Sequence, residues 1–243
     1  MNLILLELDE VDARGLVCLR DARAAHIREV LHAVPGQTVH VGVIDGATGT
    51  ATVQSVEGDT VTLRCTLEAG IAPSPSIDLL LALPRPKVMK RLWSPLAQLG
   101  VRHVILTNAA KVERAYFDTH WLEPQHYRPL LIEGLQQVGS TRLPRVTIRR
   151  RFRPLVEDEL DALSPGAVRL LADPVARERI GACGLARGRA VLLAIGPEGG
   201  WTDFERSLLV ENGFRGVQVA AGTLRSDVAC VVTLGLVLDQ MAL

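Results

Sequence analysis

Apolar and polar residues alternate in three stretches of the first 70 residues, and this period of two is typical of half-buried β-strands. The three stretches are Thr38–Val43, Thr50–Val56 and Thr60–Thr66. Turn-forming residues lie between them, at Asp45-Gly46 and at Glu57-Gly58-Asp59. A helix is expected over His26–Val34, ending before Pro35-Gly36. Residues 1–70 are therefore predicted to form a small, mostly β, barrel-like domain.

The pattern changes after residues 71–76, where the sequence IAPSPS has the prolines and serines of a linker between domains. Ile77–Leu83 is an apolar run apart from Asp78, as expected for a strand that is buried on both faces. Further strands are predicted at Val101–Leu106, Val168–Ala172, Val191–Ile195 and Val217–Ala220, and helices at Lys87–Leu99, Gln125–Val138 and Asp227–Met241. Because strands and helices alternate, residues 77–243 are predicted to form an α/β domain with a mainly parallel sheet.

The chain carries no net charge, but its charges are unevenly distributed. Residues 1–70 have five Lys and Arg residues against ten Asp and Glu, whereas residues 77–153 have 14 against five. A stretch this basic is typical of a protein that contacts nucleic-acid phosphates.

Neither a membrane segment nor a metal site is indicated. The first residues lack the basic start of a signal peptide, and no apolar run reaches the roughly 18–20 residues of a membrane span. The four cysteines are far apart and form no CxxC pair, which predicts free thiols, no metal and a reducing compartment. We therefore expect a soluble cytoplasmic protein that does not contact a membrane.

The most informative stretch is Val191–Gly213, in which an apolar strand leads into Gly196-Pro197-Glu198-Gly199-Gly200 and then into a helix. Thr202 and Glu205 have the spacing of a capping box, and Gly213 is expected to end the helix. Glycines at the carboxyl end of a parallel strand let a ligand approach the backbone closely, at the edge where α/β proteins bind ligands. The loop matches neither the dinucleotide nor the P-loop pattern, which disfavours those ligands. The alternative is that these residues form only a tight turn and bind no ligand.

A second stretch, Val219–Ala229, joins the end of a strand to the last helix through small residues. Ser226 or Asp227 is expected to cap that helix. Arg225 is a cation at a helix N-terminus, where it opposes the helix dipole. An anionic or electron-rich partner is therefore an alternative to a plain surface role for Arg225.

Basic residues gather on one face of the helix predicted after the first apolar strand. Lys87, Lys90 and Arg91 have i, i+3 and i+4 spacing, and Arg85 precedes them. Six further arginines follow between residues 142 and 153. A solvated helix face explains the first group alone, but the whole set favours a phosphate-binding surface.

Taken together, these motifs resemble one known family. The shared motifs are GPEGG between a strand and a helix, LRSDVA at 224–229, LGV at 99–101, HIREVL at 26–31, and Gln137…Thr141-Arg142…Pro144. They occur in the same order in the bacterial small-subunit ribosomal RNA uracil-N3 methyltransferases of the SPOUT superfamily. The resemblance extends over essentially the whole chain and is weaker in residues 1–70.

This resemblance implies a SPOUT-type domain, with a trefoil-knotted parallel sheet, preceded by a PUA-like β-barrel domain that helps to hold RNA. It also implies S-adenosylmethionine as methyl donor, no metal, a homodimer, and ribosomal RNA as partner, either naked or within an assembled small subunit. By match to the family, the donor pocket is expected to be lined by Leu171, Ala172, Gly196, Pro197, Glu198, Gly199, Gly200, Val219, Ala220, Leu224, Arg225 and Ala229. RNA contacts are expected from His26, Arg85, Lys87, Lys90, Arg91 and Arg142.

The implied reaction gives roles to three residues. Uracil N3 carries a proton at neutral pH and is a poor nucleophile until that proton is lost. Arg225 is expected to stabilise negative charge on the uracil oxygens, and Glu198 or Asp227 to accept the proton, directly or through water. Because N3 is hidden in a base pair, the target must be unpaired or flipped out. Trp201 then offers a stacking face, unless it only packs.

The sequence departs from the family pattern in the loop before the last helix. Ser226-Asp227-Val228 stand where the family has Thr-Glu-Thr, and Val219-Ala220-Ala221-Gly222 lacks an arginine that the family has there. Together with the acidic character of residues 1–70, these departures leave two alternatives open. One is a methyltransferase of the same superfamily that modifies another RNA nucleotide. The other is a non-catalytic paralog that binds RNA or the ribosome.

Overall fold

The chain forms two compact units, and the computed structural model describes its residues 3–68, 70, 76–185 and 188–242. The first unit comprises residues 1–73 and 132–143, and the second comprises residues 74–131 and 144–243. Residues 132–143, which we expected in the second domain, therefore group with the first. The predicted linker, residues 71–76, lies outside the described residues except for Ser76.

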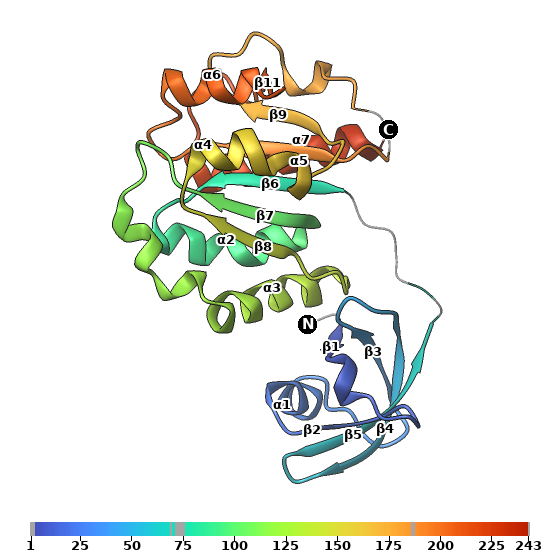
Figure 1. Ribbon diagram of the computed structural model, residues 1–243. Coiled ribbons are helices and arrows are strands. Elements are labelled where there is room, and N and C mark those ends of the chain that lie inside the picture. The colour runs from blue at the N-terminus through green and yellow to red at the C-terminus, as the bar shows by residue number, and fades with distance from the viewer. Residues whose placement is uncertain (1–2, 69, 71–75, 186–187, 243) are drawn as a thin grey trace. The chain divides into compact units, whose positions relative to one another are not determined.

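The first unit is built on a five-stranded sheet with the strand order β1-β3-β4-β5-β2 (Figure 1). Its strands are β1 (Ile4–Leu6), β2 (Leu16–Leu19), β3 (Thr38–Val43), β4 (Thr48–Glu57) and β5 (Thr60–Leu67), and its helix is α1 (Ala22–Glu29). Strands β1 and β3 run parallel, and the other neighbours run antiparallel. Leu6, Ile27, Val41, Val61 and Leu63 are fully buried in the core of this unit.

Helix α1 differs from the helix predicted over His26–Val34. It begins after Asp21, whose side chain accepts a hydrogen bond from the Arg23 backbone N–H, and it ends at Glu29. His32 then adopts a left-handed backbone with a φ of 48°, which cannot continue a right-handed helix. The prediction followed apolar spacing and overlooked the start signal that an N-cap Asp provides.

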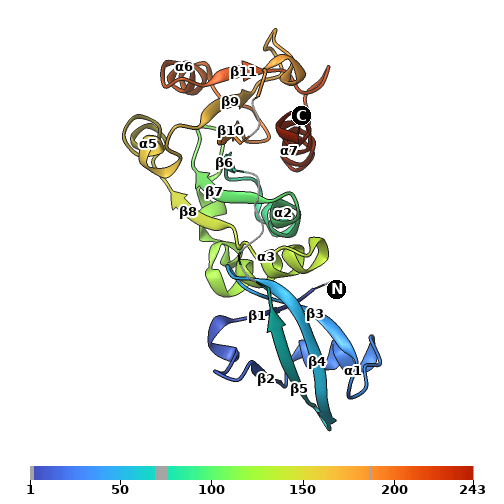
Figure 2. The same ribbon diagram turned by 90° about the vertical axis from the view of Figure 1, so that its right-hand side faces the viewer.

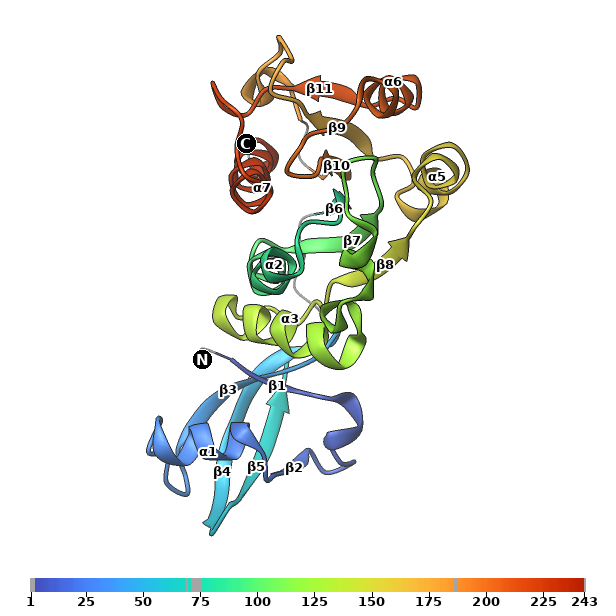
Figure 3. The same ribbon diagram turned by 90° about the vertical axis from the view of Figure 1, so that its left-hand side faces the viewer.

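The second unit contains a six-stranded sheet in which all neighbours run parallel, in the order β11-β9-β10-β6-β7-β8. Its strands are β6 (Ile77–Ala82), β7 (Val101–Thr107), β8 (Arg145–Arg149), β9 (Val168–Ala172), β10 (Val191–Ile195) and β11 (Arg215–Val217). Its helices are α2 (Pro86–Gln98), α4 (Phe152–Pro154), α5 (Leu160–Leu163), α6 (Asp203–Glu211) and α7 (Ser226–Ala242), and α3 (Pro124–Val138) spans the boundary between the units. Figures 2 and 3 show α2 and α7 on one face of the sheet and α5 and α6 on the other.

The predicted α/β domain with a mainly parallel sheet is confirmed. The strands predicted at Val168–Ala172 and Val191–Ile195 coincide with β9 and β10. Strand β11 instead ends at Val217, because Gln218 pairs only in an isolated bridge with Arg179. Within the described ranges, no helix is both long enough and apolar enough to span a bilayer.

Candidate functional site

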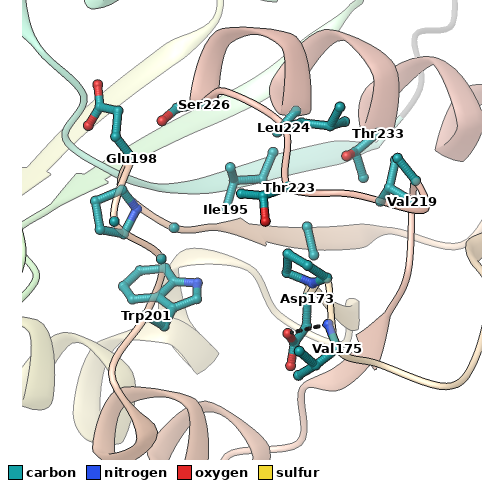
Figure 4. Close-up of a pocket in the computed structure, with 18 of the residues that line it drawn as sticks. Asp173, Val175, Ile195, Glu198, Trp201, Val219, Thr223, Leu224, Ser226 and Thr233 are labelled. Carbon is teal, nitrogen blue, oxygen red and sulfur yellow. Dashed lines mark hydrogen bonds between the residues drawn. The ribbon is translucent and has the colours of Figure 1, made fainter.

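A cavity of about 320 Å³ lies at the carboxyl edge of the parallel sheet. Its walls come from the ends of β9 and β10, the loops that follow them, the segment 219–224 and the first turns of α7 (Figure 4). The carboxyl ends of parallel strands meet at one edge, so segments that are distant in sequence converge there. The cavity has the size of a small-molecule site.

Residues 196–200 form the loop between β10 and α6, and the local sequence explains its shape. A Cβ atom on Gly196 would lie 3.1 Å from the Trp201 ring, so glycine allows the indole to pack against the loop. Gly200 has a φ of 69°, which favours glycine. Thr202 and Glu205 form the predicted capping box at the start of α6.

The neighbouring loop after β7 anchors this glycine-rich loop. Glu205 is buried, and its Oε1 accepts a hydrogen bond of 2.7 Å from Ala110 N while its Oε2 accepts one of 2.8 Å from Thr202 N. Lys111 Nζ donates to the Gly199 carbonyl at 2.7 Å. The loop is thus held both through its following helix and through its own backbone.

Three buried polar atoms at the cavity have no hydrogen-bond partner among the described residues. They are Trp201 Nε1, Ser226 Oγ and Thr233 Oγ1, and all three residues line the cavity. Figure 4 shows Trp201 on one side of the cavity and Ser226 and Thr233 on the other. A buried polar group without a partner costs about 1–3 kcal/mol. A polar ligand in the cavity would supply the missing partners.

The rest of the lining is mainly apolar, with one further charged pair. Ile195, Val219 and Leu224 contribute aliphatic side chains. Asp173 accepts a hydrogen bond of 3.1 Å from Val175 N, and its other oxygen lies 3.2 Å from Arg206 Nε. An apolar cavity with a few placed polar groups is typical of sites for cofactors and small molecules.

The structure brings together at this cavity most of the residues predicted for the donor pocket. Those in the lining are Ala172, Gly196, Pro197, Glu198, Gly199, Gly200, Val219, Ala220, Leu224 and Ala229. Leu171 and Arg225 lie outside the described lining. Leu171 is buried within the sheet, paired with Ala194 and Gly216. The Arg225 side chain is exposed and bonds to Asp227.

Several lining residues were not predicted. They include Lys111, Asp173, Val175, Arg206, Thr223 and Thr233. Most lie on segments without a recognisable motif. A signal existed for Thr233, which is a polar residue four positions after Ala229 on an otherwise apolar stretch of the last helix.

The three residues predicted to be catalytic fall into two groups. Arg225 donates to Asp227 Oδ2 at 3.0 Å, and Arg91 donates to the same oxygen at 3.1 Å. Glu198 is separate from this cluster and accepts a hydrogen bond of 3.2 Å from Arg85 N. Asp227 is therefore held by two guanidinium groups, whereas Glu198 is held by a backbone amide.

The predicted cap of the last helix is wrong. Ser226 Oγ has no partner among the described residues, and Asp227 Oδ1 accepts from the adjacent Val228 N–H. The first helical hydrogen bond runs from Ala229 N to the Arg225 carbonyl. Arg225 thus precedes the helix, and Ser226 is its first residue, with its hydroxyl free for the cavity.

The residues predicted to contact RNA lie in both units. In the second unit, Arg91 reaches Asp227, Lys90 Nζ lies 4.3 Å from the centre of the Trp121 ring, and Lys87 is exposed. In the first unit, His26 is half-buried in α1, and burial lowers its pKa. Arg142 lies in the segment 132–143.

The fold and the cavity define an α/β protein with a small-molecule site at the carboxyl edge of a parallel sheet. The RNA methyltransferase domain family matches residues 72–238. The ribosomal RNA small subunit methyltransferase E of Treponema pallidum is 30% identical over 242 residues, which are 98% of this chain and 91% of that relative. The protein of the same name from Synechocystis sp. is 27% identical over 90% of this chain and 71% of its own length. The chain belongs to the RNA methyltransferase family, and the resemblance seen in its motifs is confirmed.

Solved structures share the fold over nearly the whole chain. A ribosomal RNA small subunit methyltransferase E from Neisseria gonorrhoeae, bound to S-adenosyl methionine, has a TM-score of 0.76 at 20% identity and covers 96% of this chain and 95% of its own. A probable rRNA-methyltransferase from Porphyromonas gingivalis has a TM-score of 0.79 at 20% identity, with 98% of each chain covered.

Proposed function

We propose that this chain uses S-adenosylmethionine to methylate N3 of a uridine in small-subunit ribosomal RNA. The observation that carries the proposal is the cavity at residues 196–200, with three unpaired polar atoms, in a chain of the RNA methyltransferase family. A relative that is named a small-subunit ribosomal RNA methyltransferase aligns with 98% of the chain, and a protein of the same fold is bound to S-adenosyl methionine.

The residues of the cavity fit this donor. Ile195, Val219 and Leu224 offer apolar contact for a purine ring. Trp201 Nε1 and the hydroxyls of Ser226 and Thr233 offer hydrogen bonds to ring nitrogens, ribose hydroxyls or a carboxylate. When bound, S-adenosylmethionine supplies a methyl group that is already activated by its positively charged sulfur.

The chain's own residues then orient the base and remove one proton. Arg225 has an exposed guanidinium that is proposed to turn from Asp227 to a uracil oxygen, where it would stabilise developing negative charge. Glu198 is the better candidate for the proton acceptor, because the Asp227 carboxylate would still be engaged by Arg91 after Arg225 has turned away. Arg85 N engages Glu198 Oε1, and no described residue bonds to Oε2, so Oε2 is available to a substrate proton.

The proposal also covers the topology of the two units, the oligomeric state and the location of the protein. We infer a SPOUT-type trefoil knot in the second unit and a PUA-like barrel in the first. We also infer a homodimer, and the exposed apolar side chains of Val228, Val231 and Val232 on α7 support a protein-covered surface there. A cytoplasmic location follows from ribosomal RNA as the substrate.

Donor binding and methyl transfer test the proposal separately. Calorimetric titration should show micromolar affinity for S-adenosylmethionine. Nucleoside mass spectrometry should show 3-methyluridine in small-subunit RNA, from cells lacking the protein, after incubation with the protein and donor. A different methylated nucleoside would assign another target base. A folded protein that binds no donor and transfers no methyl group, with or without RNA, would contradict the proposal.

The roles of individual residues need matched variants. Glu198→Gln and Arg225→Gln should lower the transfer rate by about 100-fold or more. Arg225→Gln should leave donor affinity unchanged, because Arg225 lies outside the described lining. Arg189→Gln is the control, since Arg189 is exposed at the amino end of β10, the opposite edge of the sheet.

A further inference from the structure

A group of aromatic rings lies at the surface of the second unit, outside the cavity lining described above. It consists of His120, Trp121 and His126 and is called the aromatic cluster below. The ring centres of His120 and Trp121 are 4.3 Å apart, and those of His120 and His126 are 4.8 Å apart. His120 is exposed, and Trp121 and His126 are half-buried.

Packing of the core explains the aromatic residues next to the cluster, but it does not explain why the cluster itself has aromatic side chains. Trp93 of α2 is fully buried, stacks on Tyr127 and donates its indole N–H to the Trp121 carbonyl at 3.1 Å. Trp121 therefore anchors this segment through its backbone, which any residue would provide. A core role also gives no reason for an exposed imidazole beside it.

The aromatic cluster and the cavity lie at the same edge of the sheet. The segment that carries the cluster follows the carboxyl end of β7, and the cavity follows the carboxyl ends of β9 and β10. Helix α2 connects the two: Lys90 lies over the Trp121 ring, and the next residue, Arg91, reaches Asp227 at the start of α7. Figures 2 and 3 show α2 beside α7 on this face of the sheet.

This surface is also basic. Helix α2 contains no acidic residue, and Lys87 and Lys90 make no ion pair within the described part of the chain. Arg91 and Arg225 share one carboxylate, that of Asp227, which leaves a positive charge in excess. A carboxylate beside the cluster is that of Glu123, whose Oε2 lies 3.8 Å from His126 Nε2 and accepts a hydrogen bond from Gln125.

Aromatic faces beside cations bind single-stranded nucleic acid, because bases stack on the rings while cations contact the phosphates. We propose that the aromatic cluster is a stacking platform for an unpaired RNA base that flanks the target nucleotide, with Lys87 and Lys90 on the neighbouring phosphates. The inference rests on the proposed function and adds to it the form of the substrate. The RNA is single-stranded beyond the target itself, because the bases of a duplex are already stacked on one another.

The test is RNA affinity measured without methyl transfer. Fluorescence anisotropy with a short labelled oligouridine and the full-length protein should show about tenfold weaker binding for His120→Ala and for Trp121→Leu. Trp121→Phe should retain most of the affinity, since it keeps an aromatic face. Phe204→Ala is the matched control, because Phe204 is an exposed aromatic residue on α6, on the other face of the sheet.

Salt dependence separates stacking from charge. The aromatic variants should leave the slope of log affinity against log salt unchanged, whereas Lys90→Gln should reduce its magnitude by about 0.7. Unfolding midpoints and the affinity for S-adenosylmethionine, both unchanged, show that the variants are intact.

Intact aromatic variants that bind oligouridine as tightly as the wild type would overturn the platform. Equal losses in Trp121→Leu and Trp121→Phe would overturn it as well, because the ring face would then be irrelevant. So would a wild-type protein that binds duplex RNA but not the single strand, or aromatic variants that lose affinity only for a ribosomal protein. Absent methyl transfer, with oligouridine affinity still dependent on the cluster, would count against the proposed function alone.

Discussion

Thr233 and Thr107 are both fully buried, and neither hydroxyl has a hydrogen-bond partner among the described residues. They differ in position, because Thr233 lines the cavity and Thr107 ends strand β7 outside the described lining. A hydroxyl without a partner destabilises the fold wherever it is buried. A ligand in the cavity can bond to the Thr233 hydroxyl but not to the Thr107 hydroxyl. Substitution of Thr107 therefore measures the effect on stability alone, and substitution of Thr233 measures the effect on stability together with that on ligand binding.

Thr233→Val is expected to weaken the affinity for S-adenosylmethionine and to stabilise the ligand-free protein. The loss of one hydrogen bond to the donor corresponds to about 1 kcal/mol, or roughly fivefold in affinity. The free energy of unfolding should rise by up to about 1 kcal/mol, since a buried unpaired hydroxyl is removed without a change in size. Calorimetric titration and urea unfolding measure the two effects.

Thr107→Val is the control, and it should stabilise the protein without changing donor affinity. Equal donor affinity in Thr233→Val and wild type would show that the Thr233 hydroxyl makes no bond to the donor.

At the scale of single residues, the sequence predicted the part of the site that a continuous motif encodes. Residues 196–200 and the capping box of α6 follow from short-range patterns of glycines, Thr202 and Glu205. Lys111 was missed because its contact with the Gly199 carbonyl joins residues 88 positions apart. A local sequence pattern cannot predict which distant lysine will contact a given loop in the folded chain.

Neighbouring strands in the second unit are linked by a buried carboxylate. Asp78 of β6 is fully buried and accepts hydrogen bonds from Arg102 Nε of β7 at 2.9 Å and from Ser164 Oγ at 2.6 Å. The Arg102 side chain remains about half exposed. Removing Arg102 is therefore expected to cost more than removing the Asp78 charge, because the Arg102 side chain can be hydrated and the buried Asp78 carboxylate cannot.

Arg102→Met is expected to destabilise the protein by about 3 kcal/mol, since it leaves the Asp78 charge buried without its cation. Asp78→Asn should cost less, about 1 kcal/mol, because Arg102 can be hydrated and the Ser164 contact is kept. The double variant should be more stable than Arg102→Met alone. Urea unfolding of the three variants measures these differences, and a double variant that is the least stable of the three would refute the explanation.

Helix α1 is joined to the start of the first unit by an ion pair. Arg23 donates to Glu10 Oε1 and Oε2 at 2.5 and 2.7 Å, and this contact lowers the pKa of Glu10 below its usual value of 4.5. A carboxyl group with a lowered pKa stabilises the fold above its unfolded pKa, and this contribution disappears as the pH falls through the folded pKa.

Glu10→Gln should therefore cost about 1 kcal/mol at pH 7 and progressively less below about pH 4.5. Unfolding free energies of wild type and variant, measured by urea titration across this range, test the prediction. A difference that stayed constant down to pH 3 would show that ionisation of Glu10 is not its source.

At the scale of elements, prediction succeeded where burial on both faces leaves an uninterrupted apolar run. Strand β10 is of this kind, and β6 is buried throughout with Asp78 as its one polar residue. Strand β8 (Arg145–Arg149) was missed, because it lies at the sheet edge and has three half-buried residues between two exposed arginines instead of an apolar run. Its arginines suggested a basic surface instead of a strand. Edge strands are specified by their pairing partner more than by their own sequence.

For the whole chain, the division into units was the feature least visible in the sequence. Residues 132–138 complete helix α3, yet together with residues 139–143 they belong to the first unit. Thr141 is buried there, donates to the Gly46 carbonyl and accepts a hydrogen bond from Asp45 N, both at 2.7 Å. These contacts span 95 and 96 positions, so only the folded chain reveals them.

In the structure, fewer cations are available to RNA phosphates than the charge distribution along the sequence suggested. Residues 77–153 carry nine positive charges in excess, but Arg102, Arg149 and Arg153 are paired with carboxylates, two of them from beyond residue 153. Lys111 is held by the Gly199 carbonyl, so among the described residues around the cavity the cations left for phosphates are Arg85, Lys87, Lys90 and the one in excess over Asp227. The usable positive surface is therefore smaller than the sequence count.

The salt dependence of RNA binding decides between the two counts. Each phosphate contact on a single strand contributes about −0.7 to the slope of log affinity against log salt concentration. About four contacts predict a slope near −3, whereas nine would give a slope near −6. Anisotropy titrations of single-stranded RNA over a series of KCl concentrations measure this slope. A value near −6 would mean that paired arginines exchange their carboxylates for phosphates, so that the basic stretch acts as the sequence alone suggested. A value near −3 would confine the electrostatic contact to the cations around the cavity and leave stacking on the aromatic cluster to supply the remaining affinity.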